Sequence, residues 1–426
     1  MKAIGIDIGT TSVCGVVLDV ESGKMINSCT KNSDAFINSE NSWEKIQSVD
    51  KIMTVANEIL DSFIDDDVAV IGVTGQMHGI VYTDNDGNAV SPLYIWQDKR
   101  GDLPYKDTTY AEYLNSFSGY GNVTDFYNRE NGIKPICANS HCTIHDYFVM
   151  KLCGLKKPLM HSSDAASLGC YDIKKHIFNY DCNVDITTDY CIAGEYKNIP
   201  VSVAIGDNQA SVFSTLANND DILVNVGTGS QISVISENPI VADNIETRPY
   251  FDDKYLIVGA ALCGGRAYSM LKNFYSDIIG FVSKVNDVDV YDIMNKLLKT
   301  SSTSSLLVDT RFAGTRKNPE ISGSISGITT ENFNPSNLTI GVLDGMATEL
   351  YNMYKEMGCN RSGLVGSGNG IRKNKALVKI FEEKFNSNIK IPVHLEEAAF
   401  GAALFGLISA NIFNNSCDAQ KLIKYM

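Results

Sequence analysis

Residues 4 to 17 of the chain read IGIDIGTTSVCGVV, and residues 222 to 235 read ILVNVGTGSQISVI. The two stretches match at a constant offset of 222 − 4 = 218 residues. In each stretch apolar residues alternate, a Gly-Thr turn interrupts them and a second apolar run follows, which predicts a β-hairpin. Because each copy lies near the start of one half of the chain, the repeat predicts two domains of related architecture.

Length and composition agree with this division. The chain has 426 residues, and at about 150 residues per domain this allows two or three domains. Hydrophobic residues make up 44% and charged residues 20%, which is enough to build ordinary cores. We predict a first domain over residues 1–218 and a second over 219–426. Strands mixed with helices in both halves predict an α/β fold.

Hydrophobic periodicity places several elements inside these domains. The serine-rich stretch from 300 to 305 is predicted to be a surface loop. Strands are predicted at 68–73, 80–82 and 364–365. Helices are predicted at 43–63, 210–216, 344–357 and 373–385.

The charge balance and the cysteines restrict partners and location. Thirty-six basic against 50 acidic residues give a net charge of −14, so we expect no nucleic acid partner. A mean hydropathy of −0.07 without a long uncharged apolar run predicts no membrane span. Asp7 interrupts the apolar stretch that a signal peptide would need. The 11 cysteines are odd in number and include no Cys-x-x-Cys pair, which favours reduced thiols and a cytoplasmic location.

The two Gly-Thr turns are the first candidates for binding chemistry. Glycine lets a ligand approach the backbone, and successive N–H groups with threonine hydroxyls form an anion cradle. Asp7 would repel a phosphate at the first turn unless a cation lies between them, which makes Mg²⁺ the expected cation. The cradle residues are Gly9, Thr10 and Thr11 in the first turn and Gly227, Thr228 and Gly229 in the second.

A glycine cluster at 363–370 follows a predicted strand and leads toward a helix, which is the context of a nucleotide-binding loop. Ile371 stands where a G-x-G-x-x-G motif would need its third glycine, and the chain has no G-x-x-x-x-G-K-[ST] segment. A dinucleotide-dependent dehydrogenase and a P-loop NTPase are therefore not supported.

Polar side chains also gather between apolar segments. Gln76 and His78 lie between two predicted strands, where sites are commonly built. Trp96 close to Asp98 suits a polyol, since a ring face covers C–H groups while polar atoms hold hydroxyls. Asp207 separates an apolar run from a helical stretch, so it is either a helix N-cap or a general base, and the residues alone favour the cap.

His141 and His145 are four residues apart, which would place them on one face of a helix. No second group of potential ligands is evident in the sequence, so we favour packing over metal binding for this pair.

Together these segments resemble the FGGY carbohydrate kinases of the actin-like ATPase superfamily over nearly the whole chain. The resemblance implies two actin-like (ribonuclease H-like) domains of duplicated architecture with an active-site cleft between them. The first domain would carry the sugar site and the first phosphate loop, and the second the other phosphate loop and the adenosine site. The matching segments are 5–12, 206–207, 225–229, 366–370 and 396–404.

The resemblance implies an ATP-dependent kinase that phosphorylates the terminal hydroxyl of a ketose. Asp207 would be the general base and Asp7 would orient Mg²⁺. The ketose would be held by Gln76, Met77, His78, Trp96, Asp98 and Asn208. ATP would be bound by Gly9, Thr10, Thr11, Gly227, Thr228, Gly229, Gly264, Gly265, Gly368 and Asn369.

The sugar segments at 73–79, 96–98 and 143–155 look like those of family members that act on sedoheptulose, so the expected product is sedoheptulose 7-phosphate. D-Xylulose or another pentulose stays open as the substrate. A non-catalytic sugar sensor and an actin-like ATPase that acts on proteins are alternatives from other classes. The expected partners are the ketose and ATP, with a homodimer as a candidate assembly.

One position departs from the family pattern. Relatives usually carry Lys or Arg two residues after the GTTS-type turn, and this chain has Cys14. If that cation helps to hold the γ-phosphate, the charge must come from elsewhere in this protein.

Overall fold

The computed structural model describes residues 1–282, 288–299 and 306–426, so the loop predicted at 300–305 lies outside the described residues. The chain divides into two compact units. The first unit comprises residues 1–218, 248–255 and 393–424, and the second comprises 219–247, 256–392 and 425–426. The prediction assigned all of residues 219–426 to the second domain. In the structure, residues 248–255 and 393–424 belong to the first unit instead.

The first unit is built on a mixed sheet with the hydrogen-bonded order β16-β17-β6-β1-β2-β3. β1 pairs with β2 antiparallel and with β6 parallel, and the two-residue strand β18 also pairs with β6. The strands are β1 Lys2–Ile8, β2 Ser12–Asp19, β3 Lys24–Asn32, β6 Val68–Gly75, β16 Ile192–Tyr196, β17 Ile199–Ser202 and β18 Ile205–Gly206.

The second unit repeats this arrangement with the order β21-β22-β20-β19-β25-β26. β19 pairs with β20 antiparallel and with β25 parallel, as β1 does with β2 and β6. Both predicted hairpins are therefore confirmed, and each provides the central strand of its sheet. The strands are β19 Ile222–Val226, β20 Ser230–Ser236, β21 Ile245–Pro249, β22 Tyr255–Ala261, β25 Leu364–Ser367 and β26 Ile389–Lys390.

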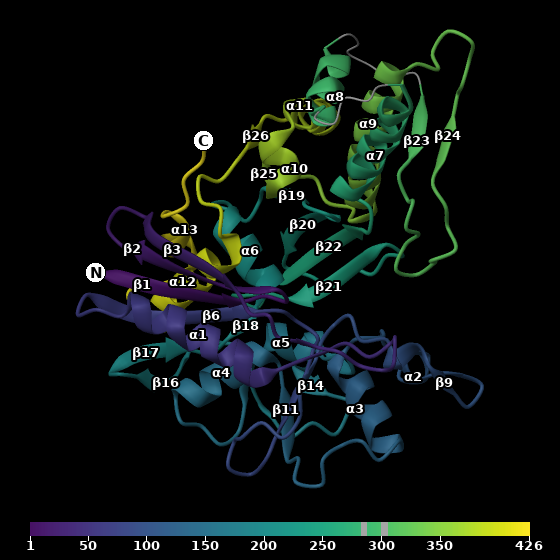
Figure 1. Ribbon diagram of the computed structural model, residues 1–426. Helices are drawn as coiled ribbons and strands as arrows, with labels where there is room; N and C mark the ends of the chain where they lie inside the picture. The colour runs from purple at the N-terminus through teal and green to yellow at the C-terminus, as the bar shows by residue number, and fades with distance from the viewer. Residues whose placement is uncertain (283–287, 300–305) are drawn as a thin grey trace. The chain divides into compact units, whose positions relative to one another are not determined.

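Helices cover both faces of the first sheet (Figure 1). Ile4, Ile6 and Ile8 face a core that includes α1 and α4. The opposite face packs on α12 so closely that a Cβ added at Gly72 would lie 1.9 Å from the carbonyl oxygen of Ala402. The helices of this unit are α1 Val49–Phe63, α2 Tyr110–Tyr113, α3 Gly121–Glu130, α4 Ile144–Leu152, α5 Ser162–Ser167, α6 Asp207–Thr215, α12 Glu397–Ser409 and α13 Ser416–Gln420.

In the second unit, the helix predicted at 344–357 begins earlier, at Pro335. Pro at the start of a helix loses no hydrogen bond, and Asn334 caps this end by accepting from the N–H of Asn337. Within the described residues, no helix is both long and apolar enough to cross a membrane. The helices are α7 Gly265–Val282, α8 Val290–Leu298, α9 Pro335–Glu356, α10 Gly368–Lys373 and α11 Lys375–Phe385.

The start of the helix predicted at 43–63 is wrong. α1 begins at Val49, because the Ser48 hydroxyl caps it by accepting from the N–H of Lys51. Residues Ile46–Gln47 form the short strand β5, which pairs with β4 (Phe36–Ile37) and β8 (Leu93–Tyr94). Strand pairing on both sides therefore prevails over the helical periodicity at this end.

Candidate functional site

Asp7 lies next to the end of β1, on the face of the sheet that α12 covers. Burial and, to a smaller extent, the nearby carboxylates of Asp207 and Glu396 together raise the pKa of its carboxyl to about 7. Three carboxylates that repel one another would be stabilised by a cation between them, and Mg²⁺ prefers such oxygen ligands. The residues of the first unit therefore fit the predicted cation.

Asp207 is the first residue of α6, and the N-cap of that helix is Gly206. The residues alone favoured Asp207 as the N-cap of this helix. That interpretation is wrong, because Gly206 is the N-cap. Burial raises the pKa of the Asp207 carboxyl, whereas His145, Arg248 and the backbone N–H of Asn208 lower it. A carboxylate in such surroundings is a candidate general base.

A hydrogen-bond network joins the first Gly-Thr turn to the predicted sugar residues. The Thr10 hydroxyl accepts from the indole N–H of Trp96 at 3.0 Å and donates to Gln76 Oε1 at 3.3 Å. Gln76 Nε2 donates to Gln47 Oε1 at 3.0 Å, and Gln47 Nε2 donates to the Thr10 carbonyl at 2.6 Å. The ends of β1 and β6 and the loop that holds Trp96 therefore meet at Thr10.

Met77 lies against the residue that precedes the predicted base. A Cβ added at Gly206 would lie 2.8 Å from Met77 Cε, so only glycine fits there without a shift. Asn208 follows the base in α6, and its Oδ1 accepts from Arg248 at 3.1 Å.

His78 has a left-handed backbone conformation with a φ of 75°. Its ring stacks on Tyr120 at 4.3 Å between centroids, and its Nδ1 lies 2.8 Å from the carbonyl oxygen of Ser167. A non-glycine residue at positive φ costs free energy, so these contacts hold the side chain in a defined place.

Asp98 differs from the other predicted sugar ligands because it is buried and its two carboxylate oxygens are engaged. Arg100 donates to Asp98 Oδ1 at 2.7 Å and to Oδ2 at 3.0 Å, and the Lys45 N–H donates to Oδ2 at 2.9 Å. The Arg100 guanidinium is itself fully buried over the ring of Tyr94. Asp98 is thus a structural partner of Arg100, and its contact with a sugar stays a prediction.

The predicted nucleotide segments meet within the second unit. The Gly265 N–H donates to the Gly227 carbonyl at 2.9 Å, and a Cβ added at Gly264 would lie 2.4 Å from the backbone of Gly229. Gly368 has a φ of 81° and lies against the Val226 carbonyl oxygen. Close backbone contacts therefore require glycine in these loops.

A cavity of about 790 Å³ opens beside these loops. Gly227, Thr228, Gly265 and Asn369 line it, together with apolar and aromatic side chains that suit an adenine ring. Arg266 and Lys373 also line it, and among the described residues no Asp or Glu does. The sequence-based prediction missed both basic residues, although Arg266 directly follows the Gly264-Gly265 pair.

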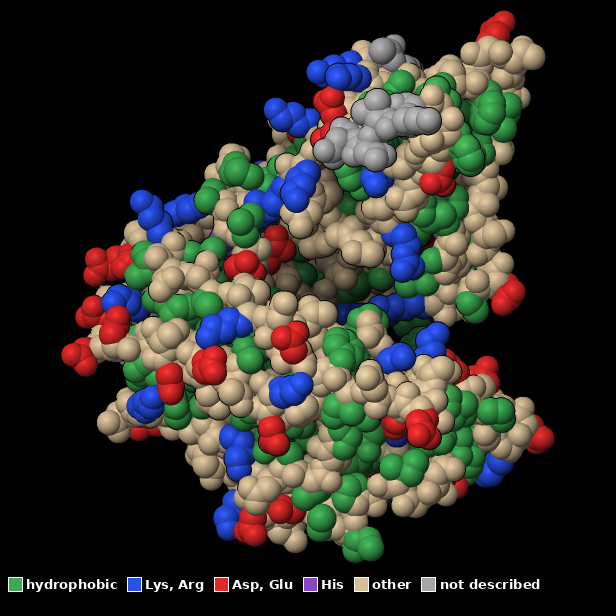
Figure 2. All heavy atoms as spheres, in the orientation of Figure 1, with side chains coloured by type: hydrophobic (Ala, Val, Ile, Leu, Met, Phe, Trp, Pro, Cys, Tyr) green, Lys and Arg blue, Asp and Glu red, His purple; other side chains and the backbone are tan. Residues whose placement is uncertain are grey.

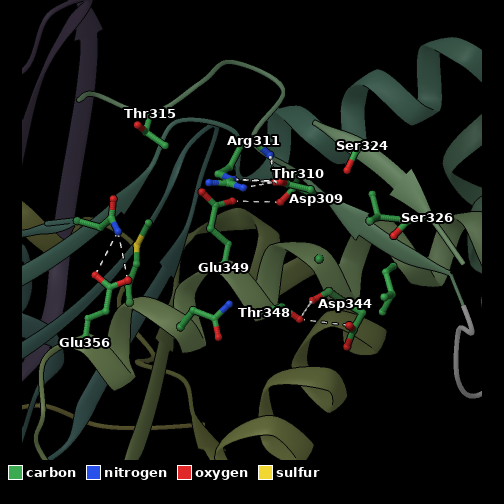
Figure 3. A pocket seen from close by; sticks show the side chains of 16 residues that line it. Asp309, Thr310, Arg311, Thr315, Ser324, Ser326, Asp344, Thr348, Glu349 and Glu356 are labelled. Atoms are coloured by element: carbon green, nitrogen blue, oxygen red, sulfur yellow. Dashed lines mark hydrogen bonds and ion pairs between the residues drawn. The ribbon is translucent and has the colours of Figure 1, made fainter. Parts of the chain in front are cut away.

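A second cavity in this unit, of about 400 Å³, contains none of the predicted site residues (Figure 3). Its polar side chains bind one another: Arg311 pairs with Asp309 at 2.6 Å, and the Thr310 hydroxyl donates to Glu349 at 3.1 Å. These mutual contacts make it a poorer candidate site than the cavity beside the glycine loops.

Cys14, the departure from the family pattern, is buried in β2. Burial raises the pKa of its thiol to about 12, so the side chain is neutral and cannot replace a basic residue.

Basic and acidic side chains are mixed over the face in view in Figure 2.

Comparison with known proteins agrees with this arrangement. Two protein-family models match, the N-terminal domain of the FGGY family of carbohydrate kinases over residues 2–108 and its C-terminal domain over 222–410. The chain is 28% identical to a sedoheptulokinase from Mus musculus over 94% of this chain and 96% of that protein. It is 23% identical to a xylulose kinase from Staphylococcus xylosus over 96% of this chain and 91% of that protein.

Among solved structures, gluconate kinase from Lactobacillus acidophilus superposes with a TM-score of 0.85 at 16% identity, covering 100% of this chain and 92% of that one. The fold is therefore the two-domain actin-like fold of ATP-dependent sugar kinases. The chain belongs to the FGGY family of carbohydrate kinases.

Proposed function

We propose that this sugar kinase transfers the γ-phosphoryl group of ATP to the terminal hydroxyl of sedoheptulose, giving sedoheptulose 7-phosphate. The support is the similarity to sedoheptulokinases, which extends over 94% of the chain. A pentulose such as D-xylulose is the second candidate, because xylulose kinases are similar over a comparable length at 23% identity.

Asp207 is the general base of the proposed reaction. Its carboxylate takes the proton of the sugar hydroxyl as the hydroxyl oxygen attacks the γ-phosphorus and ADP leaves. The observation that carries this assignment is the position of Asp207 at the start of α6, next to Gly206, which contacts Met77. Trp96, Met77, His78 and Asn208 hold the ketose, and Gln76 positions Thr10.

ATP binds through the glycine loops of the second unit and through the Gly9–Thr11 turn of the first. Mg²⁺ would be held by Asp7, and when bound it neutralises charge on the phosphates. The acidic Glu396 lies near Asp7 and would support the same ion. We further propose a cytoplasmic enzyme without nucleic acid or membrane partners, with a homodimer as the candidate assembly.

The test is ADP release from Mg²⁺-ATP with sedoheptulose, D-xylulose, D-ribulose, L-ribulose, glycerol or no sugar. We expect the highest kcat/KM with sedoheptulose, and a loss of about 10² to 10⁴ in kcat for Asp207→Asn. Preference for a pentulose would retain the mechanism and change the substrate. Turnover that does not depend on sugar, or that survives Asp207→Asn, would contradict the assignment of the base, and binding of sugar without any turnover would favour a sensor.

A further inference from the structure

Arg248 and the residue after it are bound to the first turn of α6, from which they are distant in the chain. Arg248 Nη1 donates to Asn208 Oδ1 at 3.1 Å, and Gln209 Nε2 donates to the carbonyl oxygen of Pro249 at 3.0 Å. Asn208 and Gln209 directly follow Asp207 in the sequence. All five residues belong to the first unit. The segment that carries Arg248 is therefore fixed to the same helical turn as the proposed base.

Aromatic packing holds this segment in place. Phe251 is 1% exposed, and the centroid of its ring lies 5.2 Å from that of Phe213 in α6 and 5.2 Å from that of Phe405 in α12. Pro249 restricts the residue before it to an extended backbone, in agreement with the position of Arg248 in β21. A buried anchor and a restricted backbone give the guanidinium the defined position that a ligand-binding site needs from its supporting residues.

The contact with Arg248 determines which way the Asn208 amide is turned. A guanidinium carries only hydrogen-bond donors, so the amide atom that faces it is the oxygen. The Nδ2 group lies at the other end of the amide, and in the part of the chain that the structure describes it donates to no protein acceptor. Because Asn208 is partly exposed, a ligand can reach it.

The same contact also strengthens the amide as a donor. A charged donor bound to the amide oxygen polarises the group, and hydrogen bonds in such a chain reinforce one another. Asn208 therefore offers N–H groups beside the proposed base, and these suit a ligand rich in oxygen atoms.

We propose that Arg248 is a positioning residue of the sugar site, which orients Asn208 so that its Nδ2 group donates to an oxygen of the ketose. This inference rests on the proposed role of Asn208 in holding the ketose. Arg248 does not touch the sugar and acts only through Asn208. Its loss should therefore weaken the binding of the ketose and leave the binding of ADP unchanged.

The experiment measures the Kd of sedoheptulose by isothermal titration calorimetry, without nucleotide, in Arg248→Met, Arg248→Lys and Asn208→Asp. Methionine has a similar length but donates no hydrogen bond, so we expect R248M to raise the Kd about three- to tenfold. R248K keeps one donor and should recover part of this loss.

N208D separates the two ends of the amide. An aspartate keeps an oxygen for Arg248 but has no N–H group, so we expect the Kd of the sugar to rise about tenfold although the contact with Arg248 is retained. The added negative charge has little direct effect on a neutral sugar.

Arg311→Met is the matched control. Arg311 pairs with Asp309 at 2.6 Å in the second unit, and its side chain is 40% exposed. We expect R311M to bind the sugar like the wild type. Wild-type ADP binding in R248M shows that this variant is folded, and if it does not fold, R248K and N208D carry the test.

Four results would overturn the inference. A wild-type Kd for sugar in R248M or in N208D would refute it and leave the proposed function intact. An unchanged Kd with a large fall in kcat in R248M would place Arg248 at the transferred phosphoryl group instead. Equal weakening of sugar and ADP binding in R248M would indicate a general structural role. A wild type that binds neither sedoheptulose nor a pentulose would refute the proposed function and the inference together.

Discussion

The indole N–H of Trp96 donates a hydrogen bond to the hydroxyl of Thr10, at 3.0 Å. This bond joins a predicted sugar residue to the first predicted phosphate turn within one unit. Trp96 is nevertheless 47% exposed, so a large part of its ring remains available to a ligand. A sugar that covers this ring would change the surroundings of Thr10 at the same time.

Sugar binding should therefore change the fluorescence of Trp96. The chain has two tryptophans, and the other, Trp43, lies near the buried Arg100 at 5.5 Å. We expect a saturable fluorescence change on adding sedoheptulose, which W43F keeps and W96F loses. We also expect W96F to raise the KM for sugar about tenfold, the scale of a lost aromatic contact and hydrogen bond. A change that persists in W96F would place the sugar elsewhere.

The pairing of Asp98 with Arg100 predicts a mainly structural effect of mutation. Removing one partner of a buried ion pair leaves the other charge uncompensated, so D98A should lower the free energy of unfolding by about 3–5 kcal/mol. Urea denaturation followed by circular dichroism measures this. Asp102, an exposed acid nearby, is the control, and D102A should change stability by less than about 0.5 kcal/mol. A stable D98A with a greatly raised KM would instead support direct sugar contact.

The close packing of α12 on the first sheet predicts that Gly72 cannot be replaced. The added methyl group of G72A would meet backbone atoms of Ala402, which cannot rotate away. We expect a loss of about 1–3 kcal/mol or more in the free energy of unfolding. Among the described residues, no atom lies within 4 Å of a Cβ built at Gly280 in α7, so G280A should be neutral or slightly stabilising. Equal effects of the two substitutions would contradict this packing.

Asp7 should make the metal-free protein less stable as the pH rises. The folded protein holds its proton up to a pKa of about 7, whereas an unfolded aspartate loses it near 3.8. Between these values the folded state binds more protons, so the free energy of unfolding falls with increasing pH through that range. In EDTA at pH 8, D7N should therefore be more stable than the wild type, on the order of 1 kcal/mol or more. Thermal unfolding from pH 5 to 8 measures the difference, and identical profiles would contradict it.

Arg266 should contribute to nucleotide binding, because it lines the cavity beside Thr228 and Gly265. Loss of one charged contact to a phosphate is expected to weaken ADP binding about tenfold in R266A. Isothermal titration calorimetry with ADP tests this in the absence of sugar. Lys379 on α11 pairs with Glu383 at 3.6 Å and does not line the cavity, so K379A should bind ADP like the wild type.

The sequence predicted the duplicated fold because the repeated hairpin, with its alternating apolar residues, occupies the same central position in both sheets. Local patterns were less informative at element ends. At residues 43–48 the helical periodicity was present, but pairing of β5 with strands distant in the chain prevailed. Such contacts leave no local signal.

Contacts between segments that are distant in the chain also explain which features of the candidate site the sequence did not reveal. The glycines of the nucleotide loops were evident from the chain itself, since a positive φ or a close backbone contact restricts the residue type. Arg100 lies two residues after Asp98 in the sequence. Only the structure reveals that its buried guanidinium donates hydrogen bonds to both oxygens of the Asp98 carboxylate. His145 and Arg248 lower the pKa of the Asp207 carboxyl from separate segments of the chain. An isolated sequence does not tell which segments meet.

The return of residues 393–424 to the first unit has a consequence for biosynthesis. α12 is apolar nearly all round and covers β1 and β6, whose residues leave the ribosome more than 300 positions earlier (397 − 75 = 322). Until α12 emerges, one face of that sheet lacks its cover, and the nascent chain presents an apolar surface that chaperones recognise. The first unit therefore cannot reach its final packing before residues 397–409 are made, which follow nearly all of the second unit in the chain.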